Sequence, residues 1–383
     1  MYAPLKARNS QNINSKEVVK PAKEKKIKEL IMNTLSGMTI GLFATLIIGT
    51  IFEQFASLIG NNWVGNFLND GIAKVLKAAM GIGIGIGIGI SMKQSSLKLI
   101  VSGMMGGIAT SFKLQFVNNA NPLYQPVIGL NLDPLTTYLV VLLAVLLLNL
   151  ILRKQTPIDI LLIPFLGALI AFVLTYLISG PIGYFIYYLS QFINLATTAL
   201  PLVMVIVISV SMGMILTAPI SSAAIAYLIT LGANPVAAAA AIIGTSTQMV
   251  GFAIQSRKDN PIGVVLSVFF GTSMLQFKNI IKKPTIWLPT IISSAILAPF
   301  VLLFKLPFSV EAGVIQNAWT LGAGMGTSGL VGQISTIQAM GYNNLMTWIF
   351  IVSLQIVGPI LLVYLIDLMF RKFKWIKAGD FSL

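Results

Sequence analysis

The feature that most constrains this chain is a succession of long apolar runs separated by short polar or basic segments. A helix that crosses a bilayer needs about 20 consecutive apolar residues. With 56% hydrophobic and only 9% charged residues over 383 positions, the chain has room for about ten such spans and little else. We expect the spans at 33–60, 71–91, 99–117, 134–152, 158–179, 201–217, 219–232, 235–256, 285–304 and 345–370.

The basic residues predict how these spans are oriented. They punctuate alternate gaps between the apolar runs, and residues 1–29 alone hold eight Lys and Arg against three Glu. Because Lys and Arg are enriched in cytoplasmic loops, we expect both chain ends, 1–30 and 372–383, to be cytoplasmic tails. The net charge of +14 then favours contact with anionic lipid and not with nucleic acid. The basic gaps hold Lys93 and Lys98, Arg153 and Lys154, Arg257 and Lys258, Lys282 and Lys283, and Arg371 to Lys377.

Three further segments fit no span. Residues 261–281 and 308–336 each have a short apolar half, a Gly-Thr-Ser break and a second short half. Such segments are typical of re-entrant hairpins, where irregular backbone at membrane depth lines a cavity or is buried in protein. Residues 181–200 are aromatic and amphipathic, which predicts an interfacial helix. This linker divides the chain into an N-terminal half, 31–180, and a C-terminal half, 201–371.

The stretch GIGIGIGIGI at 81–90 alternates like a strand, but both of its residue types are apolar and five glycines would weaken a strand. As part of a spanning helix, it places Gly81, Gly85 and Gly89 in one groove and Gly83 and Gly87 in another. Small residues four apart allow close approach of helix backbones. We therefore expect this helix to be held between two neighbours, with contact to a solute as the alternative.

The chain contains no His and no Cys, which excludes thiolate chemistry, a phospho-His or phospho-Cys intermediate, and metal or haem ligation by those side chains. We expect no cofactor, no metal and no catalytic residues. Of the eleven acidic residues, Glu53 and Glu311 lie at plausible membrane depth, where a carboxylate suggests function. Glu53 has the alternative of reaching the membrane interface, and Asp367 is placed to pair with Arg371 four residues later.

The tripeptide Gly-Thr-Ser occurs at 244–246, 271–273 and 326–328, and a glutamine follows each copy within a few residues. Hydroxyls and amides of this kind suit an uncharged, hydroxyl-rich ligand better than an ion. The alternative is that they serve only as polar contacts between helices. The candidate solute-binding residues are Thr245, Ser246, Gln248, Thr272, Ser273, Gln276, Glu311, Asn317, Thr327, Ser328 and Gln333.

Four stretches carry a resemblance to a known family: TAPISSAAIA (217–226), GTSTQMVGFAIQSRKDN (244–260), GTSMLQFKNIIKKPTIWLPTIISSAILAP (271–299) and LGAGMGTSGLVGQI (321–334). They resemble enzyme IIC, the membrane component of the bacterial sugar phosphotransferase system, and in particular its divergent branch that includes the perfringolysin O regulator. The resemblance covers nearly everything after the N-terminal tail.

This resemblance implies an all-α membrane fold of the glucose-superfamily type, with ten helices, an amphipathic linker and two re-entrant hairpins in the second half. It also implies a homodimer joined by the first five helices and an elevator-like motion that carries the sugar. The chain departs from the family in one respect: a histidine and a glutamate generally lie near the sugar, and here only Glu311 is available. Any phosphoryl group would have to come from separate donor subunits.

Two functions follow from these observations. The first is a permease in the bacterial cell membrane, in which the C-terminal half moves a small polar, sugar-like solute by alternating access. The second is a membrane-embedded sensor built on the same fold. An intramembrane enzyme has little support, because the few carboxylates at membrane depth are not paired in sequence.

Overall fold

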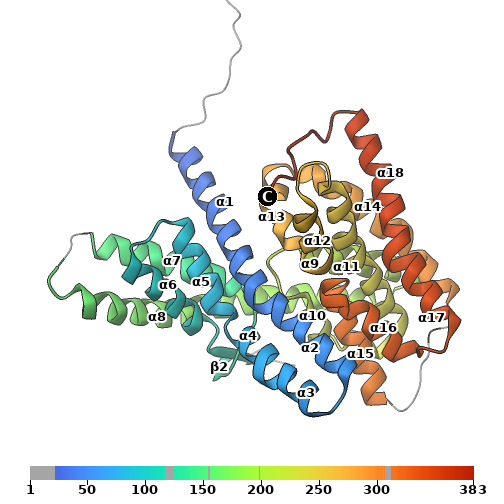
Figure 1. Ribbon diagram of the computed structural model, residues 1–383, viewed down its shortest axis with the longest axis horizontal. Helices are drawn as coiled ribbons and strands as arrows, with labels where there is room; N and C mark the ends of the chain where they lie inside the picture. Colours follow the sequence, from blue (N-terminus) through green and yellow to red (C-terminus); the bar gives the residue numbers. More distant parts are fainter. Residues whose placement is uncertain (1–21, 117–123, 154–155, 198, 305, 307–311) are drawn as a thin grey trace, which may run out of the picture.

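The computed structural model describes residues 22–116, 124–153, 156–197, 199–304, 306 and 312–383. The described chain is predominantly helical and forms an N-terminal and a C-terminal half (Figure 1). Six described helices are long and apolar enough to cross a membrane, and a seventh span results if the bent pair Trp63–Ala78 and Met80–Ser91 is counted as one. The expected count of ten spans is therefore not confirmed by helix length.

The N-terminal half begins with one long helical element. Helix α1 (Ala22–Leu42) continues through a π-helical turn, Phe43–Ile47, into α2 (Ile48–Ile59). The chain then returns through α3 (Trp63–Asn66), a second π-helical stretch and α4 (Lys74–Ala78) to α5 (Met80–Ser91), which is followed by α6 (Ser96–Ala109). The helix thus starts inside the segment 1–30 that we predicted to be a tail.

The glycine-rich segment is α5, and its packing confirms the sequence interpretation. A Cβ atom built on Gly85 would lie 2.1 Å from the backbone oxygen of Ser102 on α6, and one on Gly87 would lie 2.0 Å from the backbone oxygen of Gly37 on α1. Gly81 meets α6 in the same way, and Gly83 faces α1. The two glycine grooves therefore let α1 and α6 approach opposite sides of α5 at backbone distance.

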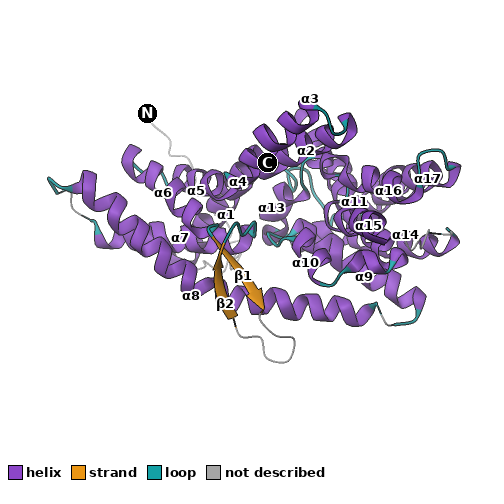
Figure 2. Cartoon of the chain, turned by 90° about the horizontal axis from the view of Figure 1, so that it is seen from below, coloured by secondary structure: helices purple, strands orange, loops and turns teal. Residues whose placement is uncertain are grey.

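The predicted helical architecture is confirmed, except for a short β-hairpin that shortens the span expected at 99–117. Helix α6 ends at Ala109, and the chain continues as β1 (Phe112–Phe116), which pairs antiparallel with β2 (Tyr124–Ile128) (Figure 2). Apolar Phe112, Leu114 and Phe116 alternate with polar Lys113 and Gln115, a period of two that is typical of a strand. Because the whole run from 99 to 117 is mostly apolar, we predicted one helix and did not detect the change to the two-residue period of a strand at Phe112.

The two halves are connected by one helix of 38 residues, α8 (Asp159–Ala196). It follows α7 (Pro134–Ile151), packs on α6 and α7 along its first part, and ends beside α9 (Pro201–Thr217) (Figure 2). The expected linker at 181–200 is thus the last part of α8 and not a separate helix, since the helix continues through Pro181. At 1.5 Å per residue, its length is about 57 Å, nearly twice the thickness of a bilayer core.

The C-terminal half is built around α11 (Pro235–Ser256). All residues of this helix are buried except Val236 and Ile254, which are partly buried. Around it pack α9, α14 (Leu288–Leu297) and α18 (Gly358–Lys372), and α17 (Leu345–Phe350) leads into α18 through a π-helical stretch.

The span expected at 219–232 is wrong. This segment contains α10 (Ser222–Leu228), a helix of seven residues, and the start of a 3-10 turn (Leu231–Ala233). The chain is interrupted on both sides of α10: Ser221 caps its start, and Thr230 adopts a left-handed backbone conformation before Asn234 caps α11. The capping residues and Pro219 therefore interrupt the helix, although the composition of the segment is apolar.

Each predicted hairpin is a pair of short helices that breaks at its Gly-Thr-Ser motif. In the first, α12 (Ile262–Phe270) is followed by a break at 271–272, a 3-10 turn (Ser273–Gln276) and α13 (Phe277–Lys282). In the second, α15 (Ala312–Met325) is followed by a tight turn and α16 (Val331–Met340). That these pairs enter the membrane without crossing it stays a prediction.

Candidate functional site

The structure brings the three Gly-Thr-Ser motifs together. A Cβ atom on Gly326, in the third motif, would lie 2.6 Å from the backbone carbon of Thr245 in the first. Thr217, at the end of α9, connects the first and second motifs. Its hydroxyl lies 2.9 Å from the hydroxyl of Ser273 in the second motif and 3.4 Å from Oε1 of Gln248, which follows the first motif. Segments far apart in the sequence thus converge around one end of α9 and the middle of α11.

The two hairpins also bind each other at their breaks. The Thr327 hydroxyl donates a hydrogen bond of 2.6 Å to the backbone oxygen of Phe269. The tip of each hairpin is therefore fixed both to α11 and to the other hairpin.

Gln248, the glutamine that follows the first motif, has several hydrogen-bond partners. Its side-chain oxygen accepts hydrogen bonds from Trp287 Nε1 at 3.0 Å and from the Thr290 hydroxyl at 2.9 Å. Its amide nitrogen and the hydroxyls of Ser246 and Thr247 have no hydrogen-bond partner among the described residues, although all are buried. The Thr245 hydroxyl bonds back to Ala241 and Ile242 in its own helix.

The three glutamines that follow the motifs, all expected to bind the solute, do not meet at one cavity. Gln276 donates to the backbone oxygen of Phe381 at 3.0 Å and accepts from Asn279 at 2.8 Å. Gln333 donates to Gln355 at 2.8 Å, a partner that neither of the other two glutamines shares. Asn317 on α15 is exposed, and Glu311 lies outside the described residues. A sequence shows that an amide is present at a given depth, but not the direction in which the folded backbone points it.

Gln276 instead anchors the end of the chain. Residues 376–383, the C-terminal segment, fold back onto the first hairpin and do not form the free tail that we expected. Phe381 is fully buried against Phe252, and Asp380 forms an ion pair with Lys283 at 2.6 Å. Asn260 and Asn279 donate to backbone oxygens of the same segment. The Asp367–Arg371 ion pair predicted from their spacing is present at 2.8 Å.

The tips of the hairpins border a cavity of about 400 Å³ between the two halves, here called the central cavity. Thr272 and Ser328 line it from the C-terminal half, together with Ser222 and Tyr227 of α10. Across from them, the N-terminal half contributes Thr50, Glu53 and Lys77. This volume falls in the range of small-molecule sites, and its lining combines apolar walls with a few convergent polar groups, as such sites do.

A partly buried ion pair gives the central cavity its charge. Lys77 Nζ and Glu53 Oε2 are in direct contact, and 22% and 37% of the two side chains remain exposed. From the sequence we considered Glu53, but Lys77, Thr50, Ser222 and Tyr227 were not predicted. A signal for the pair was available, since Lys77 and Glu53 are opposite charges within two consecutive apolar runs, and buried charges in such runs need partners.

Two further cavities adjoin the central one. One, of about 440 Å³, shares Glu53 and Leu321 with it and is rich in amides, including Gln54, Asn66 and Gln338. The other, of about 450 Å³, shares Leu132, Ser221 and Tyr227 with the central cavity. Cavities therefore follow the boundary between the halves. Within the described residues, no group of three His, Cys, Asp or Glu side chains is placed to hold a metal ion.

Comparison with known proteins gives one match. The model of a protein family described as "Phosphotransferase system, EIIC" matches residues 32–383, which is nearly the whole chain. No curated protein and no solved structure matches.

Proposed function

The chain belongs to the EIIC family of the phosphotransferase system, and from this premise we propose that it moves a small polar, sugar-like solute across the bacterial cell membrane by alternating access. Membership of this family and the long apolar helices make it a multi-pass membrane permease. The observation that carries the finer proposal is the central cavity, which lies between the two halves and is bordered by both broken hairpins.

The chemistry of this cavity suits a neutral, hydroxyl-rich solute. Thr50, Thr272 and Ser328 offer hydroxyls, and the Ser328 hydroxyl has no partner among the described residues. A buried hydroxyl without a partner is costly, so a solute hydroxyl that bonds to it is favourable. The Glu53–Lys77 pair adds one strong acceptor and one strong donor while leaving the cavity with no net charge from these two residues.

Alternating access requires one half to move relative to the other. The breaks at the hairpin tips sit at the cavity, as discontinuous helices do at the substrate sites of transporters. We therefore propose the C-terminal half as the moving part and the glycine-packed N-terminal half as the fixed part and the dimer interface. Any phosphorylation would be carried out by separate donor subunits of the same system.

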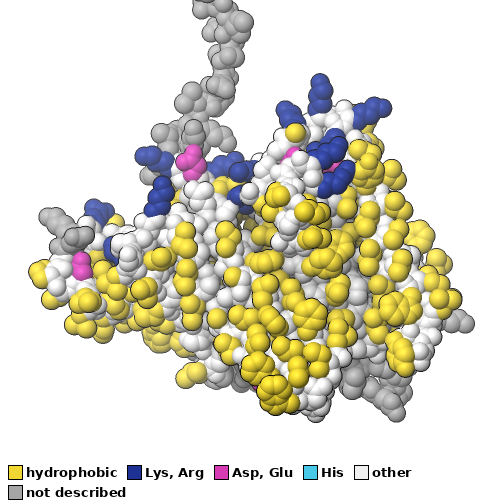
Figure 3. Space-filling view, in the orientation of Figure 1, with side chains coloured by type: hydrophobic (Ala, Val, Ile, Leu, Met, Phe, Trp, Pro, Cys, Tyr) yellow, Lys and Arg dark blue, Asp and Glu magenta, His cyan; other side chains and the backbone are white. Residues whose placement is uncertain are grey.

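The distribution of charge supports an orientation with both termini in the cytoplasm. Lys and Arg side chains gather at the end of the molecule where α1 begins and α18 ends, above a face dominated by hydrophobic side chains (Figure 3). Under the positive-inside rule this end faces the cytoplasm. Single cysteines can be introduced into this Cys-free chain as Arg257→Cys or Lys372→Cys. In sealed cells, a reagent added from outside should not label them. Labelling from outside would show that the chain has the opposite orientation.

The function is tested by thermal-shift measurement of purified protein against a panel of sugars, polyols and organic acids. We expect a sugar or polyol to raise the melting temperature, and Ser328→Ala to weaken its binding about 2- to 13-fold, the equivalent of one hydrogen bond of about 0.5–1.5 kcal/mol. Ser293→Ala is the matched control, because this serine is equally buried and bonds only within its own helix. Equal binding by both variants would remove the central cavity from the solute path.

A further inference from the structure

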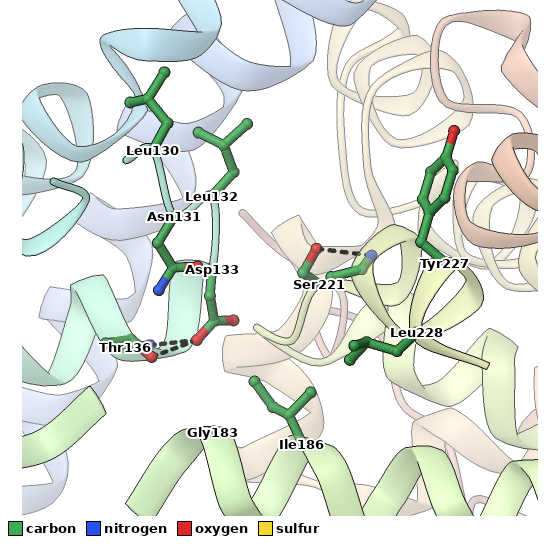
Figure 4. A pocket seen from close by; sticks show the side chains of 11 residues that line it. Leu130, Asn131, Leu132, Asp133, Thr136, Gly183, Ile186, Ser221, Tyr227 and Leu228 are labelled. Atoms are coloured by element: carbon green, nitrogen blue, oxygen red, sulfur yellow. Dashed lines mark hydrogen bonds between the residues drawn. The ribbon is translucent and has the colours of Figure 1, made fainter. Parts of the chain in front are cut away.

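The cavity of about 450 Å³ beside the central one contains an acidic group that the proposed function does not use (Figure 4). Asp133 directly precedes α7 and is only 5% exposed. Its neighbours in the cavity wall come from both halves: Leu130 and Leu132 precede it in the chain, Ile186 belongs to α8, and Ser221 and Leu228 flank or belong to α10. Asp133 therefore lies at a contact between the N-terminal and C-terminal halves.

The two carboxylate oxygens of Asp133 are in different environments. Oδ2 accepts hydrogen bonds from the backbone nitrogen of Thr136 at 2.9 Å and from the Thr136 hydroxyl at 2.5 Å. Oδ1 is buried and has no hydrogen-bond partner among the described residues. Figure 4 shows this side of Asp133 facing Ser221 across the cavity, with Oδ2 turned to Thr136. One oxygen thus caps α7, and the other has no hydrogen-bond partner, so that only the nearby backbone of Leu135 and Ser221 favours the charged form on that side.

The cavity wall offers this carboxylate no compensating positive charge. The described residues that line the cavity include no Lys or Arg, and Tyr227 of α10 is their only other titratable group. The lining residues from α7 (Thr136) and from α8 (Gly183 and Ile186) have no titratable side chain that faces Asp133. In the adjoining central cavity Glu53 and Lys77 neutralise each other. A buried carboxylate that has hydrogen bonds but no paired cation is disfavoured in its charged form.

We propose that Asp133 is a proton-binding site at the contact between the two halves, occupied when α10 packs on α8 and closes the cavity in front of Asp133, as seen here. A proton on Oδ1 removes the charge and leaves Oδ2 free to accept both bonds from Thr136, so the cap of α7 is retained. When α10 moves away, water reaches Oδ1 and the proton leaves. The proton site itself does not depend on the proposed function, whereas its consequence for transport does.

The direction of the pH dependence follows from burial. Burial raises the pKa of Asp133 above its ordinary value of 3.8, opposed by the hydrogen bonds from Thr136 and from nearby backbone. Because the folded, closed form has the higher pKa, its stabilisation by the proton is fully present below that ordinary value and is lost as the pH rises through the raised pKa. Tyr227 stays neutral throughout this range, since an ordinary tyrosine ionises near pH 10. The contact should therefore open as the pH increases.

The test uses Ile186→Cys, a cysteine at the cavity wall of the otherwise Cys-free full chain. Its labelling rate by a maleimide is compared with and without Asp133→Asn, so that the effect of pH on the thiol itself cancels. The asparagine side chain keeps the cap and imitates the protonated acid. The ratio compares the rate for Ile186→Cys alone with the rate for Ile186→Cys combined with Asp133→Asn, measured from about pH 5 to about pH 9. We expect it to rise about tenfold for each unit by which the pKa of the closed form exceeds the starting pH.

Two controls keep the result decisive. Asp70→Asn changes an exposed carboxylate and should leave the ratio as in the parent chain, and Asp133→Ser replaces Asp133→Asn if that variant does not fold. In parallel, infrared spectroscopy should show a protonated carboxylic acid band that Asp133→Asn removes. A flat ratio, or a band unchanged by Asp133→Asn, would overturn the proposal. A response to Na⁺ at constant pH that requires Asp133 would also overturn it, by making the ligand a metal cation.

Discussion

The two halves of the molecule reach dense packing by opposite means. In the N-terminal half, α5 has almost no side-chain volume on two sides, and its neighbours α1 and α6 contact its backbone. In the C-terminal half, α11 buries a row of polar side chains, among them Thr245, Ser246, Thr247 and Gln248. Backbone contact fixes helices rigidly because there is no side chain to rearrange. A polar core offers alternative hydrogen bonds, which suits the half that we propose to move.

The largest effect should come from the N-terminal half. Gly85→Leu would place a Cβ atom 2.1 Å from the Ser102 backbone oxygen, a clash that no side-chain rotation relieves. We expect loss of the folded protein, since a backbone clash costs more than the about 1–3 kcal/mol of overpacking that side chains can relieve. Size-exclusion chromatography of detergent extracts measures it.

Gly263→Leu is the matched control, because no atom lies within 4 Å of a Cβ at this position in the C-terminal half. It should elute like the parent chain. If Gly85→Leu also elutes as a folded protein and loses solute binding selectively, α5 belongs to the solute path and the contrast between the halves fails.

The next largest effect concerns the C-terminal segment, which packs on the first hairpin and on α11 in the half that we propose to move. Phe381→Ala removes a fully buried ring that packs on Phe252, and large-to-small changes of this kind cost about 3–5 kcal/mol. We expect a clear fall in the melting temperature of the C-terminal half. Phe373→Ala, which changes a ring that is 57% exposed, should have little effect. A melting temperature equal to that of the parent would show that the segment is not held in place.

A smaller effect tests the polar core itself. Gln248→Leu removes the acceptor of Trp287 and Thr290, and leaving buried donors without partners costs about 1–3 kcal/mol. The melting temperature should fall, whereas Gln338→Leu on the exposed face of α16 should not change it. Unchanged stability of Gln248→Leu would mean that water replaces the amide and that this core is hydrated.

The difference between backbone packing in the N-terminal half and side-chain hydrogen bonding in the C-terminal half also explains which features could be predicted from the sequence. The glycine period sets which faces of α5 are open to neighbours, so its packing followed from spacing alone. The Gly-Thr-Ser motifs marked where both helix pairs break. The directions of Gln276 and Gln333, however, depend on partners such as Phe381 and Gln355 that only the tertiary structure brings near. The Glu53–Lys77 pair was missed for the same reason, and the strand at 112–116 because its apolar content resembled that of a span.

The smallest effect separates structural hydroxyls of α11 from those that could meet a solute. Thr245 belongs to the first Gly-Thr-Ser motif, but its hydroxyl bonds to Ala241 and Ile242 in its own helix, and it does not line the central cavity. Those two carbonyls lie in a regular helix and keep their backbone partners when the hydroxyl is removed. Thr245→Val should therefore change stability by at most about 0.5–1 kcal/mol.

The same variant should bind the solute as the parent does, whereas Thr272→Val, which changes a cavity-lining residue, should bind it more weakly. Thermal denaturation with and without the solute identified by the thermal-shift panel measures both quantities on one sample. Weaker binding by Thr245→Val at unchanged stability would contradict the assignment. It would mean that the first motif turns toward the solute in another state of the transport cycle, so that the polar core of α11 rearranges where the glycine contacts of α5 cannot.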